Sequence, residues 1–475
     1  MQHPHATPAT ARVDGGPPFG ARDGLRYGAL GLPLAFVALP LYVLLPPHYA
    51  AVHGAPLAAL GGVLLATRLL DAVLDPWLGH LSDHLLDRGP RTAWRAAAWG
   101  CGAIAAGFTL LFTPPAWGAA GLLAWLAAGL LWTTVAYSGV TILHHAWGAR
   151  LGGGAEQRAR VVGWREGSAL VGVLVASVLP GVAGLALTGA ALSVLLAAGV
   201  ALLATAPPPR PPQRTEVAEG QPDAQAGLQT NALADAQAAA LRHAQGAGRA
   251  ASAPHGAACG RTSAHGRPWR HAGFRSLLAV FMLSGIASAV PATLVIFFVR
   301  DRLQAAAWEP VFLGGYFLAA ALSVPAWLRL VPRLGLAGGW LAGMALAIAG
   351  FAGVGALGAG DTGAFLAVCL VTGVALGADL TFPGALLAGL VRRAGHGGRA
   401  EGAYFGWWQA AAKLNLALAA GLALPLLAAA GYTPGSRDAP AQTALIAAYA
   451  GLPLLLKAAA AALLLRHRAR HGEDR

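Results

Sequence analysis

The stretch Arg68-Leu-Leu-Asp71-Ala-Val-Leu-Asp75-Pro-Trp-Leu-Gly-His-Leu-Ser-Asp83 places several charges inside a hydrophobic segment that runs from about residue 51 to residue 81. Arg68, Asp71 and Asp75 are spaced by three and four residues, so a helix puts their side chains on one face. Each ionised group at the centre of a bilayer costs roughly 2.5–3.5 kcal/mol on insertion scales. These three charges are therefore expected to face a protein interior or a water-filled cavity, which is typical of an ion or substrate path.

The composition around this stretch predicts an all-α membrane protein. The chain has 475 residues, of which 56% are hydrophobic and 11% are charged, whereas ordinary soluble proteins have about 25% charged residues. We predict twelve transmembrane helices, because twelve apolar segments each approach the length of about 20 residues that crosses a bilayer. The predicted spans are 28–48, 54–81, 96–113, 118–147, 161–183, 185–206, 275–299, 310–331, 336–357, 362–391, 401–430 and 442–465.

The basic residues are distributed asymmetrically between the loops. Of the 33 Lys and Arg residues, 27 lie in the two tails and in the loops on the same side of the predicted membrane. By the positive-inside rule this distribution predicts that both termini are cytoplasmic, in a bacterial-type inner membrane. The net charge of +13 then reflects topology, and we expect no nucleic-acid partner because no aromatic and basic binding surface accompanies it.

The order of the spans predicts the domain organisation. We expect an N-terminal tail at 1–27, a six-helix bundle at 28–206, a disordered linker at 207–274, a second six-helix bundle at 275–466 and a C-terminal tail at 467–475. Two six-helix bundles joined by a long cytoplasmic segment have the layout of the major facilitator fold, in which substrate binds near the midplane between the halves. The three cysteines are far apart, which gives no disulfide framework and no CxxC metal site. We expect no metal and no cofactor, and a monomer.

Three motifs resemble one family of such transporters. The stretch from Arg68 to Asp83, followed by Arg88-Gly-Pro-Arg91, resembles the second span and following loop of the glycoside–pentoside–hexuronide:cation symporters, the melibiose permease family. The segment Gly398-Arg-Ala-Glu-Gly-Ala-Tyr-Phe-Gly406, which leads to Lys413, resembles the eleventh helix of that family with its intramembrane lysine. The segment Glu156-Gln-Arg158, followed by Arg165, resembles the loop and the arginine that open the fifth span.

The resemblance implies a coupling-cation site at Asp71 and Asp75, with Arg68 and Lys413 as the nearby cations. Two carboxylates on adjacent helical turns repel each other when both are ionised, so a bound H⁺ or Na⁺ would relieve that repulsion. We hypothesise that Lys413 approaches both aspartates across the two halves of the chain, and that cation binding competes with this ion pair. The alternative is a salt-bridge network with Arg68 that only fixes packing.

Two departures from the family bear on the coupling ion and the solute. Leu74 precedes Asp75 where melibiose permease has a polar amide that helps to hold Na⁺, so we expect H⁺ more than Na⁺. The predicted first and fourth helices contain no Asp or Glu, so the acidic clamp of the galactoside binders is absent. Because these carboxylates are missing, an alternative function remains, namely transport of lysophospholipids or other amphiphiles by a protein of the same fold.

Other residues are candidates for the solute cavity and for a gate. The carboxylate of Asp379 lies in an apolar run and requires an explanation within a membrane. The full set of candidate substrate-binding residues is Tyr137, Thr141, His145, Arg165, Asp379, Trp408 and Gln409. Asp83, Arg88 and Arg91 resemble the cytoplasmic charge latch of this superfold. Lys457 either snorkels toward the interface or packs internally.

These observations predict a secondary transporter and not an enzyme. No Walker A loop, HExxH sequence or nucleophile elbow is present in the sequence. We expect alternating access, with symport of a sugar-like or glycoside-like small-molecule solute and a coupling cation across the lipid bilayer. The remaining alternative is a non-transporting membrane sensor or scaffold that acts through the segment between the bundles.

Overall fold

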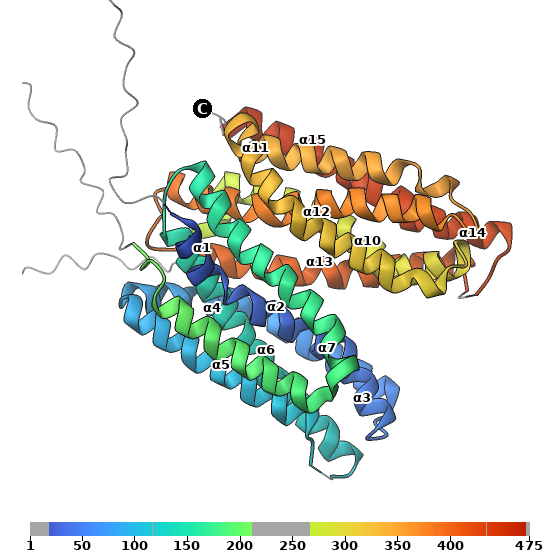
Figure 1. The fold of residues 1–475 in the computed structure, drawn as a ribbon, viewed down its shortest axis with the longest axis horizontal. Helices are drawn as coiled ribbons and strands as arrows, with labels where there is room; N and C mark the ends of the chain where they lie inside the picture. The colour runs from blue at the N-terminus through green and yellow to red at the C-terminus, as the bar shows by residue number, and fades with distance from the viewer. Residues whose placement is uncertain (1–18, 116, 211–266, 434, 472–475) are drawn as a thin grey trace, which may run out of the picture. The chain divides into compact units, whose positions relative to one another are not determined.

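The computed structural model describes residues 19–115, 117–210, 267–433 and 435–471, and the regular elements within these ranges are all helices (Figure 1). The first half contains α1 (Ala21–Gly28), α2 (Gly31–Leu39), the π-helix η1 (Pro40–Leu44), α3 (Leu45–Ala51), α4 (Leu57–Asp87), α5 (Pro90–Phe112), α6 (Ala119–Arg150) and α7 (Ala155–Ala204). The second half begins with α9 (Arg267–Arg270), α10 (Ala272–Phe297), η3 (Phe298–Arg302), η4 (Ala306–Trp308), α11 (Glu309–Ala352) and η5 (Val354–Ala356). It continues with α12 (Thr362–Arg393), α13 (Glu401–Ala429), α14 (Ala439–Ile446), η6 (Ala447–Gly451) and α15 (Leu452–His471).

Two of these helices each contain two of the predicted spans. The long helix α7 breaks at Gly184, where φ is 74°, and α11 breaks at Gly335, where φ is 68°. This left-handed region favours glycine, so each break falls where the sequence permits it. The described residues thus form the twelve predicted spans, with α2 to α3 and α14 to α15 counted as one span each. By length and composition alone, seven of the described helices are suited to crossing a membrane.

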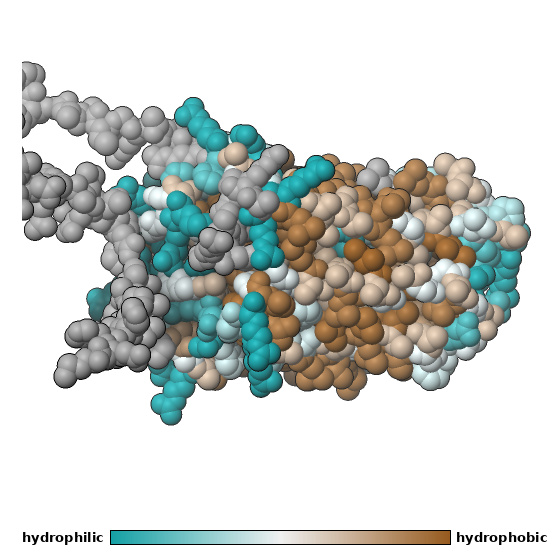
Figure 2. All heavy atoms as spheres, turned by 90° about the horizontal axis from the view of Figure 1, so that it is seen from above, coloured by the Kyte–Doolittle hydropathy of each residue, from teal (hydrophilic) through white to brown (hydrophobic). Residues whose placement is uncertain are grey.

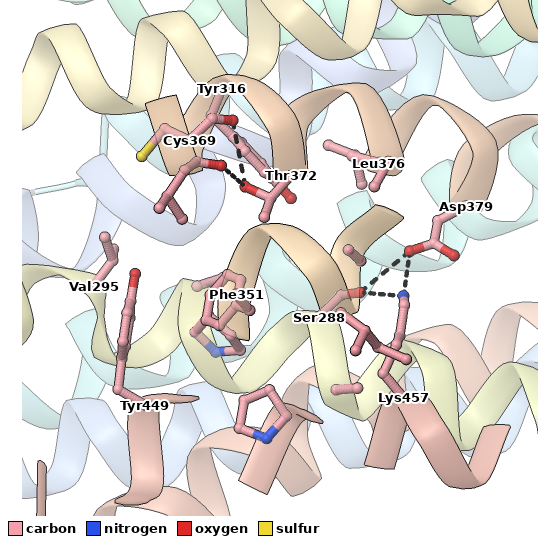
Figure 3. Close-up of a pocket in the computed structure, with 18 of the residues that line it drawn as sticks. Ser288, Val295, Tyr316, Phe351, Cys369, Thr372, Leu376, Asp379, Tyr449 and Lys457 are labelled. Atoms are coloured by element: carbon pink, nitrogen blue, oxygen red, sulfur yellow. Dashed lines mark hydrogen bonds and ion pairs between the residues drawn. The ribbon is translucent and has the colours of Figure 1, made fainter. Parts of the chain in front are cut away.

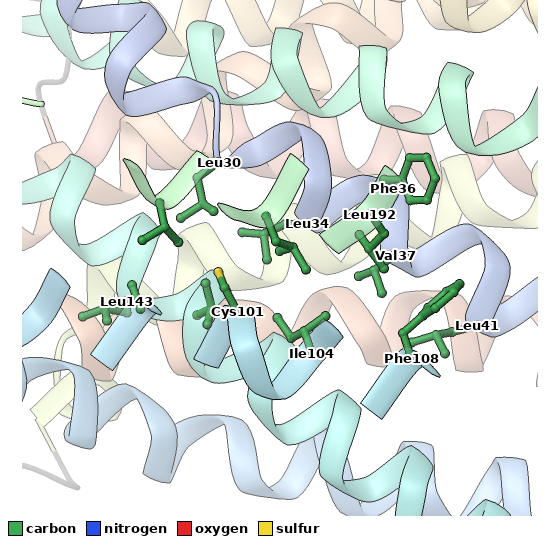
Figure 4. Packing of buried hydrophobic residues seen from close by; sticks show 14 of the residues in the cluster. Leu30, Leu34, Phe36, Val37, Leu41, Cys101, Ile104, Phe108, Leu143 and Leu192 are labelled. Carbon is green, nitrogen blue, oxygen red and sulfur yellow. The ribbon is translucent and has the colours of Figure 1, made fainter. Parts of the chain in front are cut away.

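Each half of the chain has its own apolar core. Figure 4 shows residues of the first span, among them Leu34, packed against Ile104 and Phe108 of α5 and against Leu192 of α7. In Figure 1 the helices coloured blue to green group together, and those coloured yellow to red form a second group. On the face seen in Figure 2, a band of hydrophobic side chains separates two hydrophilic ends, as expected of an integral membrane protein.

Glycines bring the two bundles into close contact. A Cβ atom added at Gly79 of α4 would lie 2.2 Å from the carbonyl oxygen of Gly402 on α13, and one added at Gly406 would lie 2.6 Å from the carbonyl oxygen of Asp75. These distances leave no room for a side chain, so the backbones of α4 and α13 touch directly. In addition, α6 packs on α13, and α7 packs on both α11 and α12.

The ends of the bundles differ from the predicted domain limits. The predicted tail 1–27 includes most of α1, whose Tyr27 is fully buried and whose Gly24 and Gly28 lie against Trp164 of α7. Small residues one turn apart allow this helix to approach α7 closely, an effect that a polar composition does not reveal. At the other end, α15 continues through most of the predicted tail to His471.

The predicted linker 207–274 lies largely outside the described residues, which omit 211–266. Its described start packs on the first bundle, because Arg210 N donates to the carbonyl oxygen of Arg150 at 3.0 Å. Trp147 Nε1 also donates to the carbonyl oxygen of Pro207 at 3.0 Å. Its described end contains α9 and the first residues of α10.

Candidate functional site

The first buried polar site joins the two bundles and consists of Asp71, Asp75, Ser138 and Lys413, which we call the Lys413 cluster. Lys413 Nζ of α13 lies 2.7 Å from Asp71 Oδ2 and 2.7 Å from Asp75 Oδ1, both on α4. It also donates to Ser138 Oγ of α6 at 2.7 Å, and Ser138 Oγ donates to Asp71 Oδ1 at 3.0 Å. The expected approach of Lys413 to both aspartates is therefore present.

The charges in the Lys413 cluster are unevenly matched. One ammonium serves two carboxylates, whose residues are only 1% and 0% exposed. Within the described residues Asp75 Oδ2 is buried and has no hydrogen-bond partner. Arg68 lies one turn before Asp71 on α4 and is half-buried. A buried carboxylate oxygen that lacks a donor is a place where an added proton or cation gains stabilisation.

The local sequence explains how these helices meet. The spacing of four residues between Asp71 and Asp75 sets both carboxylates on the face of α4 that turns toward α13. Gly406 lets the α13 backbone touch α4 beside Asp75, and Lys413 follows seven residues later, about two turns along the helix. A lysine side chain at that position returns toward Asp75 because helical side chains tilt toward the N-terminus.

The second buried polar site lies within the C-terminal bundle, and we call it the Lys457 cluster. Lys457 Nζ of α15 forms an ion pair with Asp379 of α12 and donates to Ser284 Oγ at 2.9 Å and to Ser288 Oγ at 3.1 Å, both on α10. Trp340 Nε1 of α11 donates to Asp379 Oδ1 at 2.8 Å. Of the two alternatives considered for Lys457, the structure shows internal packing, because Lys457 is 5% exposed.

A third cluster lies near the ends of the helices, on the side of the bundles that carries α1 and the end of α15. Arg150, which ends α6, pairs with Asp83 at 3.2 Å, with Asp87 at 2.8 Å and with Glu401 at 3.0 Å. Asp83 also accepts hydrogen bonds from two backbone N–H groups at the start of α13, those of Gly402 at 2.7 Å and Ala403 at 2.8 Å. An acidic side chain at a helix N-terminus is favoured by the helix dipole. These contacts link the two bundles, and we call this group the Arg150 gate.

The predicted membership of this gate requires correction. Arg88 and Arg91 were predicted as gate residues together with Asp83. Both arginines are exposed, and the ion pair of Asp83 is with Arg150. The chain turns at Gly89, whose φ is 110°, so Arg88 follows the last residue of α4 and Arg91 lies in the first turn of α5. Both arginines therefore lie on the outside of the bundle, whereas Asp87, one turn after Asp83, still reaches Arg150. Arg150 and Glu401 were not predicted as gate residues, although Glu401 belongs to a quoted motif.

The other predicted substrate-binding residues lie on α6, α7 and α13. Arg165 is buried and pairs with its neighbour Glu166 at 2.7 Å. Trp408 stacks on Phe281 with ring centroids 4.0 Å apart, which is a packing contact between α13 and α10. The half-buried residues among the candidates are Tyr137, His145 and Gln409. Thr141 is buried, and its Oγ1 has no hydrogen-bond partner among the described residues.

Comparison with known proteins identifies the family. Residues 26–212 and 257–469 match the family model of MFS/sugar transport proteins, which is most of the chain. The chain therefore belongs to this family of the major facilitator superfamily, whose members are transporters and not enzymes. No match to a curated protein sequence is found.

Solved structures share the fold at low sequence identity. A bacterial homologue of the iron transporter ferroportin, in its outward-facing state, superposes with a TM-score of 0.62 at 14% identity, over 94% of this chain and all of the other. The E. coli fucose:proton symporter gives a TM-score of 0.57 at 14% identity, over 94% of this chain and 98% of the other. A human organic anion transporter superposes with a TM-score of 0.54 at 18% identity, over 94% of this chain and 99% of the other. At these identities the likeness establishes the major facilitator fold.

Proposed function

We propose that this protein is a cation-coupled symporter of a sugar-like or glycoside-like solute, with H⁺ more than Na⁺ as the coupling ion. The observation that carries the proposal is the position of Lys413 between Asp71 and Asp75, across the interface of the two bundles. A site of this kind links the protonation or cation occupancy of α4 to the packing of α4 against α13. Alternating access requires such a link.

The proposed coupling step is a competition for the two aspartates. A proton or cation that binds at Asp75 neutralises one of the two carboxylates that hold Lys413, which weakens the attraction between α4 and α13. Release of the cation restores that charge and the ion pair. The free energy available from the membrane potential is about 2.3 kcal/mol per charge per 100 mV, which is enough to shift a two-state equilibrium by more than tenfold.

The ligands around Asp75 support H⁺ as the coupling ion. Leu74 contributes no oxygen, and the one neutral side-chain oxygen in the Lys413 cluster is Ser138 Oγ, which already engages Asp71 and Lys413. A hard cation such as Na⁺ needs several oxygen ligands, whereas a proton needs one free carboxylate oxygen. The buried Asp75 Oδ2 meets the second requirement.

The Arg150 gate is the part of the proposed mechanism that opens and closes one end of the transport path. We infer that the described conformation is closed at the Arg150 gate, because the Arg150 ion pairs and the Asp83 contacts tie α4 and α6 to α13 there. We place this end in the cytoplasm, as the distribution of basic residues predicts, and the protein in a bacterial-type inner membrane. Opening toward the cytoplasm then requires the Arg150 pairs to separate.

The solute class rests on the sugar-transport family and on the three motifs that resemble the glycoside–pentoside–hexuronide:cation symporters. Membership of that narrower group is part of this proposal. The candidate solute ligands are those of the sequence analysis other than Asp379, whose carboxylate is engaged in the Lys457 cluster. Arg165 and Gln409 are the proposed hydrogen-bond donors to hydroxyl groups. The alternative solute is a lysophospholipid or another amphiphile, and the experiment must distinguish it from a sugar-like solute.

The test is solute-driven proton movement into proteoliposomes that contain the full chain. A panel of pentosides, hexuronides, disaccharides and lysophospholipids is added in turn, with and without Na⁺, and the internal pH is recorded. We expect one sugar-like compound to carry protons inward in the wild type, and we expect Asp75→Asn to abolish the proton signal. Glu156→Gln is the matched control, because Glu156 is an exposed carboxylate that pairs only with its helical neighbour Arg160 at 3.5 Å among the described residues.

Three outcomes would contradict the proposal in different ways. A proton signal that survives in Asp75→Asn rejects the coupling site. A signal that depends on Na⁺ rejects H⁺ as the ion. Movement of a lysophospholipid and of no sugar rejects the solute class and leaves the site intact.

A further inference from the structure

A cavity of about 260 Å³ lies inside the C-terminal bundle, beside the Lys457 cluster (Figure 3). Its walls come from α10, α11, α12, η6 and α15, and none of its lining residues belongs to the first half of the chain or to α13. Most of the lining is apolar and aromatic, as at Phe351 and Val295. At the rim, Leu313 of α11 is 41% exposed and Ala292 of α10 is also exposed, so the cavity reaches the surface between these helices. The cavity is thus separate from the Lys413 cluster.

The charged groups that line this cavity are already engaged by one another. The three N–H donors of Lys457 are directed to Ser284, Ser288 and Asp379. Asp379 Oδ1 accepts from Trp340 and Ser284, and Oδ2 accepts from Lys457 and Ser288. The ammonium and the carboxylate neutralise each other, so this site has no spare charge for an ionised ligand.

Two hydroxyl groups on the cavity wall remain available. Tyr316 of α11 and Tyr449 of η6 both line the cavity, and neither hydroxyl has a hydrogen-bond partner among the described residues. Tyr449 is only 3% exposed. A tyrosine hydroxyl at the wall of an apolar cavity usually finds a hydrogen-bond partner, because its ring is apolar and its end is polar. A ligand with one hydroxyl or similar polar group would provide that partner.

The volume limits the size of the ligand. An apolar cavity of about 150 Å³ holds one benzene molecule. A cavity of about 260 Å³ is therefore large enough for one or two fused rings with a small polar substituent. Pockets that are mainly apolar, with a few convergent polar groups, are the usual form of small-molecule sites.

We propose that this cavity is a binding site for a compact, neutral, largely aromatic molecule that carries one hydrogen-bonding group, with Tyr316 and Tyr449 as its polar contacts. The ion pair of Asp379 with Lys457 closes one end of the site and excludes anionic analogues. This site is independent of the coupling site, so its test does not depend on the proposed symport.

The experiment measures saturable binding of 2-naphthol to the full-length protein in lipid nanodiscs, with empty nanodiscs as the lipid background. We expect one saturable site per chain. Ala347→Phe on α11 fills the cavity and should weaken binding at least tenfold. The matched control is Ala345→Phe, which adds the same side chain at an exposed position of the same helix outside the cavity lining, and should leave binding unchanged.

Two further measurements keep the proposal testable if Ala347→Phe folds poorly. Tyr449→Phe and Tyr316→Phe preserve the shape of the cavity, and together they should weaken 2-naphthol binding about three- to tenfold while leaving naphthalene binding unchanged. The anion 2-naphthoate should bind at least tenfold more weakly than 2-naphthol.

Clear results would overturn the proposal. Absence of saturable 2-naphthol binding rejects the site, and equal weakening by Ala345→Phe and Ala347→Phe rejects its location. Naphthoate binding tighter than that of 2-naphthol would show that Lys457 is available to anions, which rejects the neutral ligand class.

Discussion

Lys413 and Lys457 are both buried lysines paired with membrane-embedded aspartates, yet their surroundings differ. Lys413 lies on α13 and contacts carboxylates on α4 and a hydroxyl on α6, so its contacts cross from one bundle to the other. Lys457 contacts only groups of its own bundle. The first ammonium serves two carboxylates, whereas the second serves one carboxylate that also accepts from an indole and two hydroxyls.

The difference indicates which pair can respond to a cation. Around Asp379 the charges balance and the acceptors are occupied, so the Lys457 cluster is suited to hold four helices of one bundle together. The Lys413 cluster has one ammonium for two carboxylates, and its contacts must change if the bundles move apart. A cluster that is incompletely neutralised and that spans a moving interface is suited to be a switch.

The largest expected effect is that of Lys413→Met, which leaves two carboxylates buried without their ammonium. Removal of one partner of a buried pair costs about 3–5 kcal/mol. Because protonation relieves the repulsion between the two carboxylates, we expect the loss of stability to be greatest at high pH and smaller at low pH. Unfolding of the variant and the wild type in detergent across a pH series measures this. A loss that is the same at every pH would contradict the imbalance of charge.

The corresponding change in the other cluster, Lys457→Met, should cost about 3 kcal/mol because one carboxylate retains its neutral donors. The double variant Lys457→Met with Asp379→Leu should recover most of that loss, because it removes both charges together. Thermal unfolding of the three proteins measures the recovery. A double variant as unstable as the single one would show that the pair contributes more than charge balance.

A smaller effect is expected at the Arg150 gate, because Asp87 is 43% exposed and the buried Asp83 and Glu401 keep backbone N–H donors. Arg150→Ala should cost about 2 kcal/mol, since hydrogen bonds to charged groups contribute about 1.5–3 kcal/mol. It should also open the gate between the bundles, measured as increased labelling of a cysteine introduced beside Glu401. Arg88→Ala and Arg91→Ala are the controls, and each should change stability by less than about 0.5 kcal/mol. Equal effects of all three variants would show that Arg88 and Arg91 also belong to the gate.

The smallest expected losses of stability are those of two serines that occupy corresponding positions in the two clusters. Ser138 and Ser284 each accept from a lysine and donate to an aspartate. Ser138→Ala should cost about 1–2 kcal/mol, whereas Ser284→Ala should cost about 0.5–1 kcal/mol because Ser288 makes the same two contacts. Chemical unfolding of both variants gives the difference. A larger loss for Ser284→Ala would contradict the description of the Lys457 cluster as the better-satisfied site.

Much of the fold could be predicted from the sequence. Apolar segments of membrane length, interrupted near Gly184 and Gly335, indicated the spans and the two breaks that the structure contains. The spacing of Asp71 and Asp75 indicated that they share a helix face, because helical periodicity is a local property. The helix α1 was missed, since its polar residues concealed two glycines that pack on α7.

The tertiary structure decided which charges meet, and the sequence had indicated one of these pairings, that of Lys413 with Asp71 and Asp75, through the family resemblance. Asp75 and Lys413 are 338 residues apart, and Asp379 and Lys457 are 78 residues apart, so no local spacing relates them. Asp83 pairs with Arg150 and not with Arg88, although Arg88 is far closer in sequence. The physical reason is that helix periodicity fixes the face on which a side chain lies, whereas its partner depends on which helices pack together. That packing is set by close backbone approach at glycines such as Gly79, Gly402 and Gly406, and by the shapes of the opposing faces.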